Sequence, residues 1–162
     1  MKKLFLIGFL ALGSINYVSS QQISKNALGL RLGDGDGFGA ELNYQRGIGE
    51  NNRLEFGLGW RDEDNFDAFR LTGLYQWVFL LENNFNWYVG AGGGFGNVDF
   101  DTGFMGGDDS EFFIFVAGDI GIEYNFDIPL LISLDFRPEI GFKDYNDDLG
   151  FDIALGIRYQ FD

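Results

Sequence analysis

Apolar and polar side chains alternate along most of this chain, in segments separated by turn-forming residues. Successive side chains of a β-strand point to opposite faces of its sheet, so a period of two predicts strands with one apolar and one polar face. Clusters of Gly, Asp, Asn and Glu between the segments are typical of turns and loops. The eight segments predicted as strands are 27–33, 38–48, 53–61, 66–80, 85–96, 112–126, 130–142 and 150–161.

The segment 130–142 shows the two faces most clearly. Leu134 and Phe136 belong to its apolar face, and Asp135 and Arg137 belong to the opposite face. The other predicted strands repeat the pattern, so the sheet needs an apolar environment on one side and a polar environment on the other.

Two closed β-architectures offer such a pair of environments. A soluble barrel of the lipocalin type turns its apolar faces inward, whereas a barrel in a membrane turns them outward to the lipid. Here the polar faces are rich in Gly and Ala, as a narrow lumen requires, and aromatic residues near the strand ends fall on the apolar faces. We therefore predict an all-β fold, a closed eight-stranded antiparallel transmembrane β-barrel in up-and-down meander order. The predicted lipid-facing anchors are Trp60, Tyr75, Trp77, Trp87, Tyr124, Tyr159 and Phe161.

The predicted connections alternate in length. Those at 49–52, 82–84 and 127–129 are tight, and the one at 97–111 is the longest. Tight turns on the periplasmic side and longer loops outside are typical of bacterial outer-membrane barrels. The first and third connections are short for outer loops, so the rule holds only in part.

The first twenty residues differ in composition from the rest of the chain. Two lysines precede an apolar run over 4–12, and small polar residues follow as far as Ser20. This is the pattern of a secretory signal peptide, and the run is too short to span the ~30 Å hydrocarbon layer as a helix. We predict a cleaved signal peptide over 1–20 and a barrel domain over 21–162. No cysteine follows the run, which excludes a lipid-anchored lipoprotein.

Composition removes several classes of function. The formal net charge of −14, from 25 acidic against 11 basic residues, disfavours nucleic acid as a partner, because nucleic-acid binding needs a basic face. The chain contains no Cys and no His, which excludes thiol nucleophiles, zinc–thiolate sites and the commonest general base. The sequence therefore predicts no catalytic residue, no cofactor and no complete metal site.

The C-terminal stretch 155–161 alternates hydrophobic residues and ends on an aromatic residue, Phe161, one position before Asp162. This stretch resembles the insertion signal of the small eight-stranded outer-membrane β-barrel family, the OmpA/OmpX-type barrels. The segment 133–139 resembles strands of Bacteroidetes-type barrels. The resemblance covers 27–162 and implies a Gram-negative outer-membrane location, with recognition by the barrel-assembly machinery through the C-terminal strand. Enzymes of similar architecture depend on a histidine, which this chain lacks, so we predict a non-enzymatic protein.

Charged residues recur on the polar faces of the predicted strands. Opposite charges buried in a narrow lumen are expected to pair, because an unpaired buried charge is costly. Eight strands enclose an interior that side chains just fill, so we predict a network of ion pairs that plugs the lumen. The residues predicted to form this network are Arg31, Glu41, Glu55, Arg70, Asp119, Glu123, Asp135, Arg137, Glu139, Asp152 and Arg158.

Glycines on one predicted strand keep an alternative open. Gly90, Gly92, Gly94 and Gly96 share the polar face of the segment 85–96. They leave room either for large neighbouring side chains or for a narrow path for ions or small apolar solutes. The large neighbours expected on the same wall are Tyr88, Phe113 and Phe115. The main prediction is a structural or surface-interaction protein, and the alternative is a small channel or conduit.

Acidic residues gather in the predicted outer loops, where Lys143 is the only base. Clustered carboxylates attract hard cations, and the stretches 34–37 and 108–111 are the best candidates for Ca²⁺ or Mg²⁺, although neither completes a twelve-residue calcium loop. The simpler interpretation is a solvated acidic rim beside lipopolysaccharide bridged by divalent ions. We expect a monomer in outer-membrane lipid. The loop acids are Asp34, Asp36, Asp62, Glu63, Asp64, Asp99, Asp101, Asp108, Asp109, Glu111, Asp144, Asp147 and Asp148.

Overall fold

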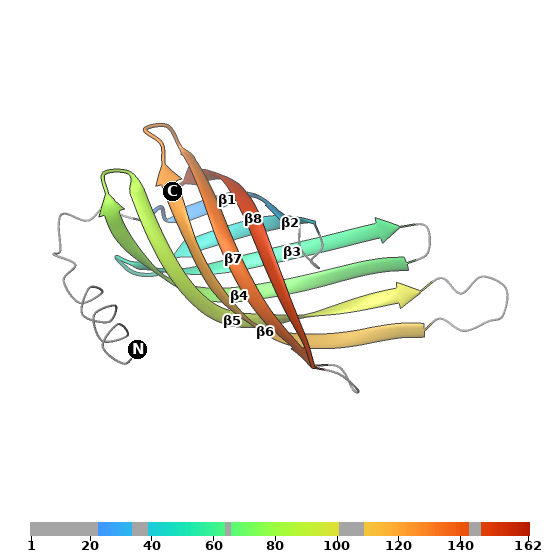
Figure 1. Cartoon of the computed structure of the whole chain (residues 1–162). Coiled ribbons are helices and arrows are strands. Elements are labelled where there is room, and N and C mark those ends of the chain that lie inside the picture. Colours follow the sequence, from blue (N-terminus) through green and yellow to red (C-terminus); the bar gives the residue numbers. More distant parts are fainter. Residues whose placement is uncertain (1–22, 34–38, 64–65, 101–108, 143–146) are drawn as a thin grey trace, which may run out of the picture.

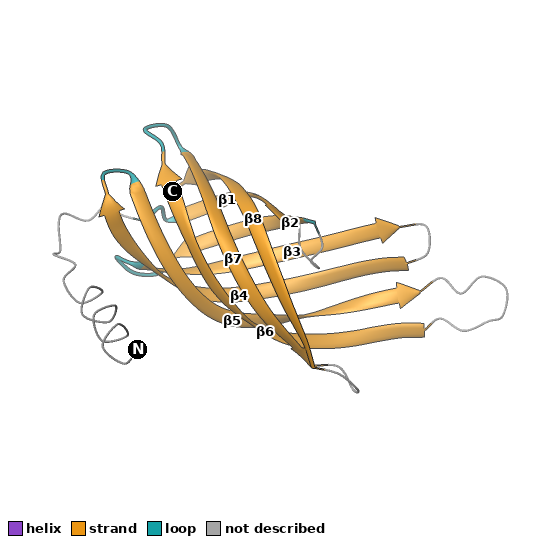
Figure 2. Cartoon of the chain, viewed as in Figure 1, coloured by secondary structure: helices purple, strands orange, loops and turns teal. Residues whose placement is uncertain are grey.

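A computed structural model of the chain describes residues 23–33, 39–63, 66–100, 109–142 and 147–162. The predicted signal peptide lies outside these residues. Eight β-strands make up most of the described chain (Figures 1 and 2). In chain order they are β1 (Asn26–Gly33), β2 (Ala40–Gly47), β3 (Asn52–Glu63), β4 (Phe66–Glu82), β5 (Phe85–Phe100), β6 (Asp109–Asn125), β7 (Leu130–Phe142) and β8 (Asp147–Phe161).

Each strand pairs with its neighbour in the sequence in antiparallel fashion, and β1 pairs with β8 to close the sheet into a barrel. The closing register runs from Asn26 opposite Phe161 to Gly33 opposite Ala154. Closure joins the two strands that would otherwise be edges, which is how a sheet satisfies its backbone groups in lipid. The predicted eight-stranded meander barrel is confirmed.

No helix in the described part of the chain is long and apolar enough to cross a membrane.

The two ends of the barrel differ. One end, called here the tight-turn end, carries the connections 48–51, 83–84 and 126–129, together with the start of β1 and the end of β8 (Figure 1). Asn83 in the shortest of these turns has a φ of 50°. A short polar side chain tolerates this left-handed conformation better than other side chains do. The opposite end is called the loop end.

At three of the four loop-end connections the strands continue farther than the sequence pattern indicates, whereas β2 begins at Ala40, two residues later than predicted. β5 runs to Phe100 and β6 begins at Asp109, so the fifth connection is 101–108 and the prediction of 97–111 is wrong. The positions added to β5, Asn97 to Phe100, alternate in the opposite phase, with polar residues on the outward face, and those added to β6, 109–111, are all polar, so they do not continue the pattern by which the strands were predicted. Their pairing needs only backbone hydrogen bonds, as between Asp99 and Ser110. In the same way, the predicted connections 62–65 and 143–149 shorten to 64–65 and 143–146.

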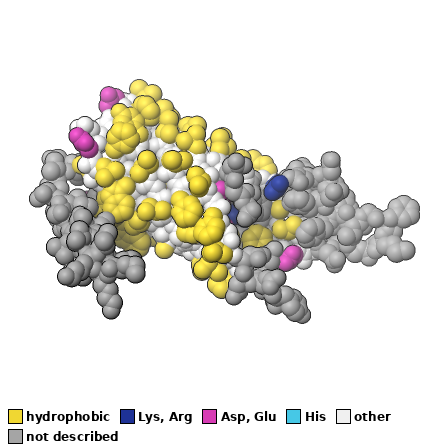
Figure 3. All heavy atoms as spheres, in the orientation of Figure 1, with side chains coloured by type: hydrophobic (Ala, Val, Ile, Leu, Met, Phe, Trp, Pro, Cys, Tyr) yellow, Lys and Arg dark blue, Asp and Glu magenta, His cyan; other side chains and the backbone are white. Residues whose placement is uncertain are grey.

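The apolar faces of the strands form the outer wall of the barrel. Leu134 on β7 is 49% exposed, and Leu155 opposite it on β8 is 42% exposed. Figure 3 shows hydrophobic side chains gathered over one side of this wall. A continuous apolar wall suits lipid rather than water.

The interior of the barrel is mainly polar. Among the buried side chains of the described residues, 18 are polar or charged and nine are hydrophobic. One small apolar cluster lies inside, formed by Leu74, Phe115 and Ala117 with Phe113 packed against it. The distribution of polarity is thus the reverse of that in a soluble globular protein.

Candidate functional site

The eleven charged residues expected in the lumen all come from inward-facing positions of the strands. Ten of them are buried, and the eleventh, Glu139, is half-buried. The period of two places each of them on the same face of its strand as its charged or small neighbours two residues away. The strand register then decides which cations meet which acids.

Glu41 on β2 is one centre of the interior. Its carboxylate lies 3.2 Å from Arg70 on β4, 3.3 Å from Arg137 on β7 and 3.8 Å from Arg31 on β1. Arg70 also binds Glu139: the two Nη atoms of Arg70 lie 3.0 and 2.6 Å from the two carboxylate oxygens of Glu139. Such a two-pronged contact fixes both side chains in position.

Glu55 on β3 is a second centre. Its Oε1 accepts from Arg137 Nη2 at 2.8 Å, and its Oε2 accepts from Gln45 at 2.7 Å and from Gln76 at 3.0 Å. Arg158 on β8 adds a longer contact of 3.4 Å to the same oxygen. Arg137 therefore links the two centres, because it contacts both Glu41 and Glu55.

Arg31 on β1 holds two aspartates toward the loop end. Its guanidinium donates to Asp135 Oδ1 from Nε at 3.0 Å and from Nη2 at 2.5 Å, and to Asp152 Oδ2 from Nη1 at 2.5 Å. Arg31 also reaches Glu41, so these contacts belong to the same network.

Arg53 is a member of the interior that the sequence prediction left out. It is 1% exposed, lies 2.8 Å from Glu123 and donates from Nε to Gln76 Oε1 at 2.6 Å. Gln76 in turn donates to Glu55, so Glu123 joins the network through Arg53 and Gln76. The available signal was the position of Arg53 two residues before Glu55, on the same face of β3. The network thus runs without interruption from Asp152 to Glu123.

The glycine face of β5 lies against aromatic rings. A Cβ atom added at Gly94 would lie 2.6 Å from the Phe115 ring, and one added at Gly96 would lie 2.5 Å from the Phe113 ring. The Arg70 guanidinium stacks over the Phe115 ring, 4.9 Å from its centre. These two glycines therefore accommodate large neighbours, which is one of the two roles considered for them above.

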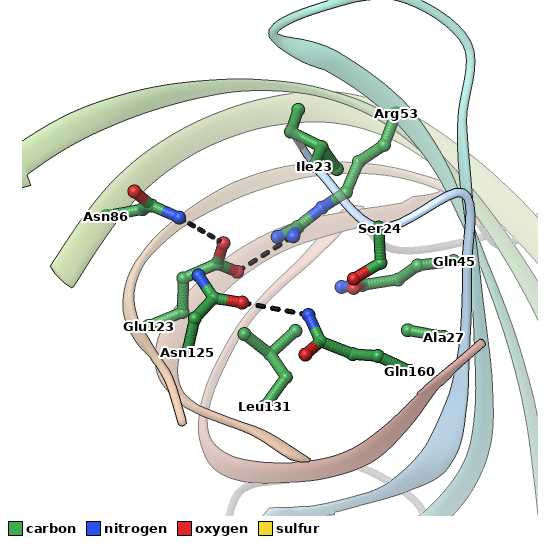
Figure 4. Close-up of a pocket in the computed structure, with 10 residues that line it drawn as sticks. All are labelled: Ile23, Ser24, Ala27, Gln45, Arg53, Asn86, Glu123, Asn125, Leu131 and Gln160. Atoms are coloured by element: carbon green, nitrogen blue, oxygen red, sulfur yellow. Dashed lines mark hydrogen bonds and ion pairs between the residues drawn. The ribbon is translucent and has the colours of Figure 1, made fainter. Parts of the chain in front are cut away.

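A polar cavity of about 170 Å³ lies inside the tight-turn end (Figure 4). Arg53 and Glu123 form one side of it, and Asn125 and Gln160, which share a hydrogen bond of 2.8 Å, form another. The hydrogen-bonded network lies between this cavity and the loop end.

The predicted anchors lie on the outer wall. Trp60, Trp77, Tyr159 and Phe161 are exposed, whereas Tyr75, Trp87 and Tyr124 are half-buried. Six of the seven lie toward the tight-turn end, and only Trp60 lies toward the loop end. Rings pair along this girdle: Tyr75 with Trp77, Phe79 with Trp87, Phe85 with Tyr124, and Tyr159 with Phe161.

Most of the predicted acidic rim lies outside the described side chains. Of its members, the structure describes the side chains of Asp99 and Glu111, both exposed, and Asp99 accepts a hydrogen bond of 2.8 Å from Asn97. Within the described part of the chain, no group of three or more acidic side chains is arranged to hold a metal ion. The candidate cation stretch 34–37 lies outside the described residues, and of the stretch 108–111 the structure describes the side chains of Ser110 and Glu111 only, both exposed.

Comparison with known proteins gives matches of structure but not of sequence. No protein-family model matches this chain, and no curated protein is similar to it in sequence. The crystal structure of Neisserial surface protein A matches with a TM-score of 0.59 at 13% identity, covering 84% of this chain and 94% of that one. The N-terminal β-barrel domain of Pseudomonas aeruginosa OprF matches with a TM-score of 0.66 at 12% identity, covering 86% and 98%.

A third match is Ail, the attachment invasion locus protein of Yersinia pestis, with a TM-score of 0.59 at 19% identity, covering 85% of this chain and 97% of that one. A de novo designed transmembrane β-barrel also matches, with a TM-score of 0.59 at 14% identity, covering 88% and 100%. Identities this low carry the fold and nothing finer. The chain therefore has the fold of the small eight-stranded outer-membrane β-barrels.

Proposed function

We propose that this chain is a non-enzymatic integral protein of the Gram-negative outer membrane, with a structural or surface-interaction role and a lumen closed by its ion-paired network. The observation that carries the proposal is the connection of the interior arginines and acids from Asp152 to Glu123. Several of these contacts cross the lumen rather than follow its wall. Arg137 on β7 and Glu55 on β3 come from strands on opposite sides of the barrel.

The network blocks the lumen because its members are held in place. Arg31, Arg53, Arg137 and Arg158 are each 1% exposed, so little room for water remains around them. Separating a buried ion pair leaves both charges without partners in a poorly hydrated space, which is expensive. An eight-stranded barrel is also narrow enough for side chains to fill.

The surface role rests on the charge of the predicted outer loops and on the kind of protein that shares the fold. One structural neighbour is a Neisserial surface protein and another is an attachment invasion locus protein, which was also solved in complex with the heparin analogue sucrose octasulfate. The acidic loops of this chain would repel such a polyanion. We propose instead that they face divalent cations, and through them the anionic groups of lipopolysaccharide.

Biogenesis follows from the same proposal. Residues 1–20 would be cleaved as a signal peptide during export, and β8 would present the stretch 155–161 to the barrel-assembly machinery. The mature barrel would stay monomeric in outer-membrane lipid.

Two measurements test the proposal. The mature protein should leave membranes only with detergent and should migrate differently on gels before and after heating, as a folded barrel does. Liposomes that contain it should not swell in an isosmotic solution of a small sugar. Extraction without detergent would contradict the membrane assignment, and rapid swelling would contradict the closed lumen.

The cavity at the tight-turn end supports a second candidate function, a conduit for ions or small apolar solutes. It gives a solute access to the first part of the lumen as far as Arg53 and Glu123. A path from there would have to follow the glycine face of β5, where the Phe113 and Phe115 rings lie. Swelling of liposomes by the native protein, with a further increase when Phe115 is replaced by Ala, would favour this candidate.

A further inference from the structure

The interior of the barrel holds more acids than bases. Among the residues whose side chains the structure describes, five buried arginines face seven acids there, when the half-buried Glu139 is included. The arginines are Arg31, Arg53, Arg70, Arg137 and Arg158, and the acids are Glu41, Glu55, Asp119, Glu123, Asp135, Glu139 and Asp152. An excess of buried negative charge is costly unless a proton or another cation neutralises it.

Asp119 on β6 is the one acid of these seven that forms no ion pair with an arginine. Among the described residues, each of the other six acids lies within 4.0 Å of at least one arginine nitrogen, whereas Asp119 forms no such pair. Its Oδ2 accepts from Gln76 Nε2 at 2.5 Å, and its Oδ1 has no hydrogen-bond partner although Asp119 is only 5% exposed. Gln76 cannot turn its amide around, because its oxygen already accepts from Arg53.

Two more buried oxygens beside Asp119 lack a partner. They are the Tyr88 hydroxyl and Asp135 Oδ2. Tyr88 on β5 and Asp135 on β7 are both register partners of Gly121 on β6, two residues from Asp119 on the same face. A Cβ at Gly121 would lie 2.5 Å from the Tyr88 hydroxyl, so this hydroxyl lies over the inward face of β6, the strand that carries Asp119.

We propose that the folded barrel binds one proton at Asp119 and keeps this carboxyl neutral at neutral pH. The proton lies on Oδ1, the carboxyl oxygen without a hydrogen-bond partner. The Tyr88 hydroxyl and Asp135 Oδ2 also lack partners, but they form no hydrogen bond with Oδ1 or with each other in the structure, so they would meet it only after the side chains shift. This one proton, taken from solvent during folding, removes the one carboxylate charge that has no arginine.

Charged and titratable groups face Asp119 from the two adjacent strands, β5 and β7, and from β3 across the interior. They are Glu55 on β3, Tyr88 on β5, and Asp135 and Arg137 on β7, whereas β4 presents the neutral Gln76. Arg137 is the one cation among them, but its Nη atoms are held by Glu41 and Glu55. Its Nε has no partner, so a direct Arg137–Asp119 pair is the arrangement that competes with a bound proton.

Infrared spectroscopy of the refolded barrel in detergent at neutral pH tests the proposal directly. A protonated carboxyl group gives a C=O band that a carboxylate lacks. We expect such a band in the native protein, its loss in Asp119→Asn, and its retention in Asp127→Asn, a matched control in an exposed turn. Absence of the band from the native protein, or its survival in Asp119→Asn, would overturn the proposal.

Stability against pH gives an independent test. The folded state would hold a proton that the unfolded chain releases above its ordinary carboxyl range, so raising the pH from 5 to 7 should lower the folding equilibrium constant by about tenfold per pH unit. Asp119→Asn should remove this slope and keep the barrel folded, whereas Asp135→Asn should destabilise it. Tyr88→Phe should weaken the band or shift it.

The competing arrangement gives the opposite result. If Arg137 Nε pairs with an ionised Asp119, Asp119→Asn lowers stability as much as Asp135→Asn, and the slope between pH 5 and 7 is absent. This inference rests on the packed interior proposed above, but separate experiments test the closed lumen and the proton at Asp119. A conducting barrel would contradict the closed lumen and leave the infrared band unchanged.

Discussion

Arg137 on β7 and Glu55 on β3 meet across the lumen, with Arg137 Nη2 2.8 Å from Glu55 Oε1, although 82 residues separate them in the chain. In an eight-stranded meander these two strands lie on opposite sides of the barrel. The contact therefore ties the two walls together as well as filling the space between them. Through Arg137, which also contacts Glu41, this contact joins the two centres of the interior network, Glu41 and Glu55.

Replacing Arg137 with Ala should destabilise the barrel by about 3–5 kcal/mol, because Glu41 and Glu55 each lose a buried partner. Unfolding in urea, with the protein in lipid vesicles, measures the change as a lower midpoint. Asp135→Ala should act in the same direction, since it leaves Arg31 without one of its acids.

The control for these two variants is Lys25→Ala, which removes an exposed cation at the tight-turn end. Its midpoint should stay within error of the native value. Unchanged midpoints for both Arg137→Ala and Asp135→Ala would mean that the interior pairs do not stabilise the barrel.

Replacing Leu134 with Arg tests which face meets the lipid. Leu134 is 49% exposed on the outer wall and lies opposite Leu155, so a charge there should cost about 2–4 kcal/mol near the middle of the bilayer. Leu81 is also exposed but lies beside a turn, and Leu81→Arg should cost only about 0–1 kcal/mol. Equal costs at the two depths, or none at Leu134, would contradict the orientation of the faces.

A methyl group at Gly94 should destabilise the barrel, because its carbon would overlap the Phe115 ring and the Leu71 carbonyl oxygen. Overpacking of this kind costs about 1–3 kcal/mol. Gly150→Ala is the matched control, since a Cβ there meets nothing within 4 Å. Equal urea midpoints for the two variants would show that the glycine face is not packed against the rings.

The sequence was sufficient to predict the closed eight-stranded meander, because alternation depends only on the order of residues along each strand. It was not sufficient at the loop end, where β5 and β6 extend through polar residues such as Asn97 and Ser110. Beyond the membrane the outward face no longer needs to be apolar, so the pattern by which the strands were predicted stops while the backbone pairing continues.

The sequence could predict which charged residues lie in the interior of the barrel, but not which of them contact one another. Ten of the predicted charged residues are buried. Each lies on the polar and Gly-rich face of its strand, which is the face that points into the lumen. Which arginine meets which acid depends on the register between strands, and the alternation does not encode it. Arg53 was omitted although it shares a face with Glu55, and the isolation of Asp119 becomes visible only once the arginine contacts are assigned.

Single-channel recording of the refolded protein in a planar bilayer tests the closed lumen most directly. The account predicts a silent bilayer for the native barrel. It also predicts discrete, salt-dependent steps for the double variant Glu55→Gly with Arg137→Gly, which removes both sides of the contact across the lumen. Discrete steps from the native barrel would contradict the closed lumen and redirect attention to the glycine face of β5.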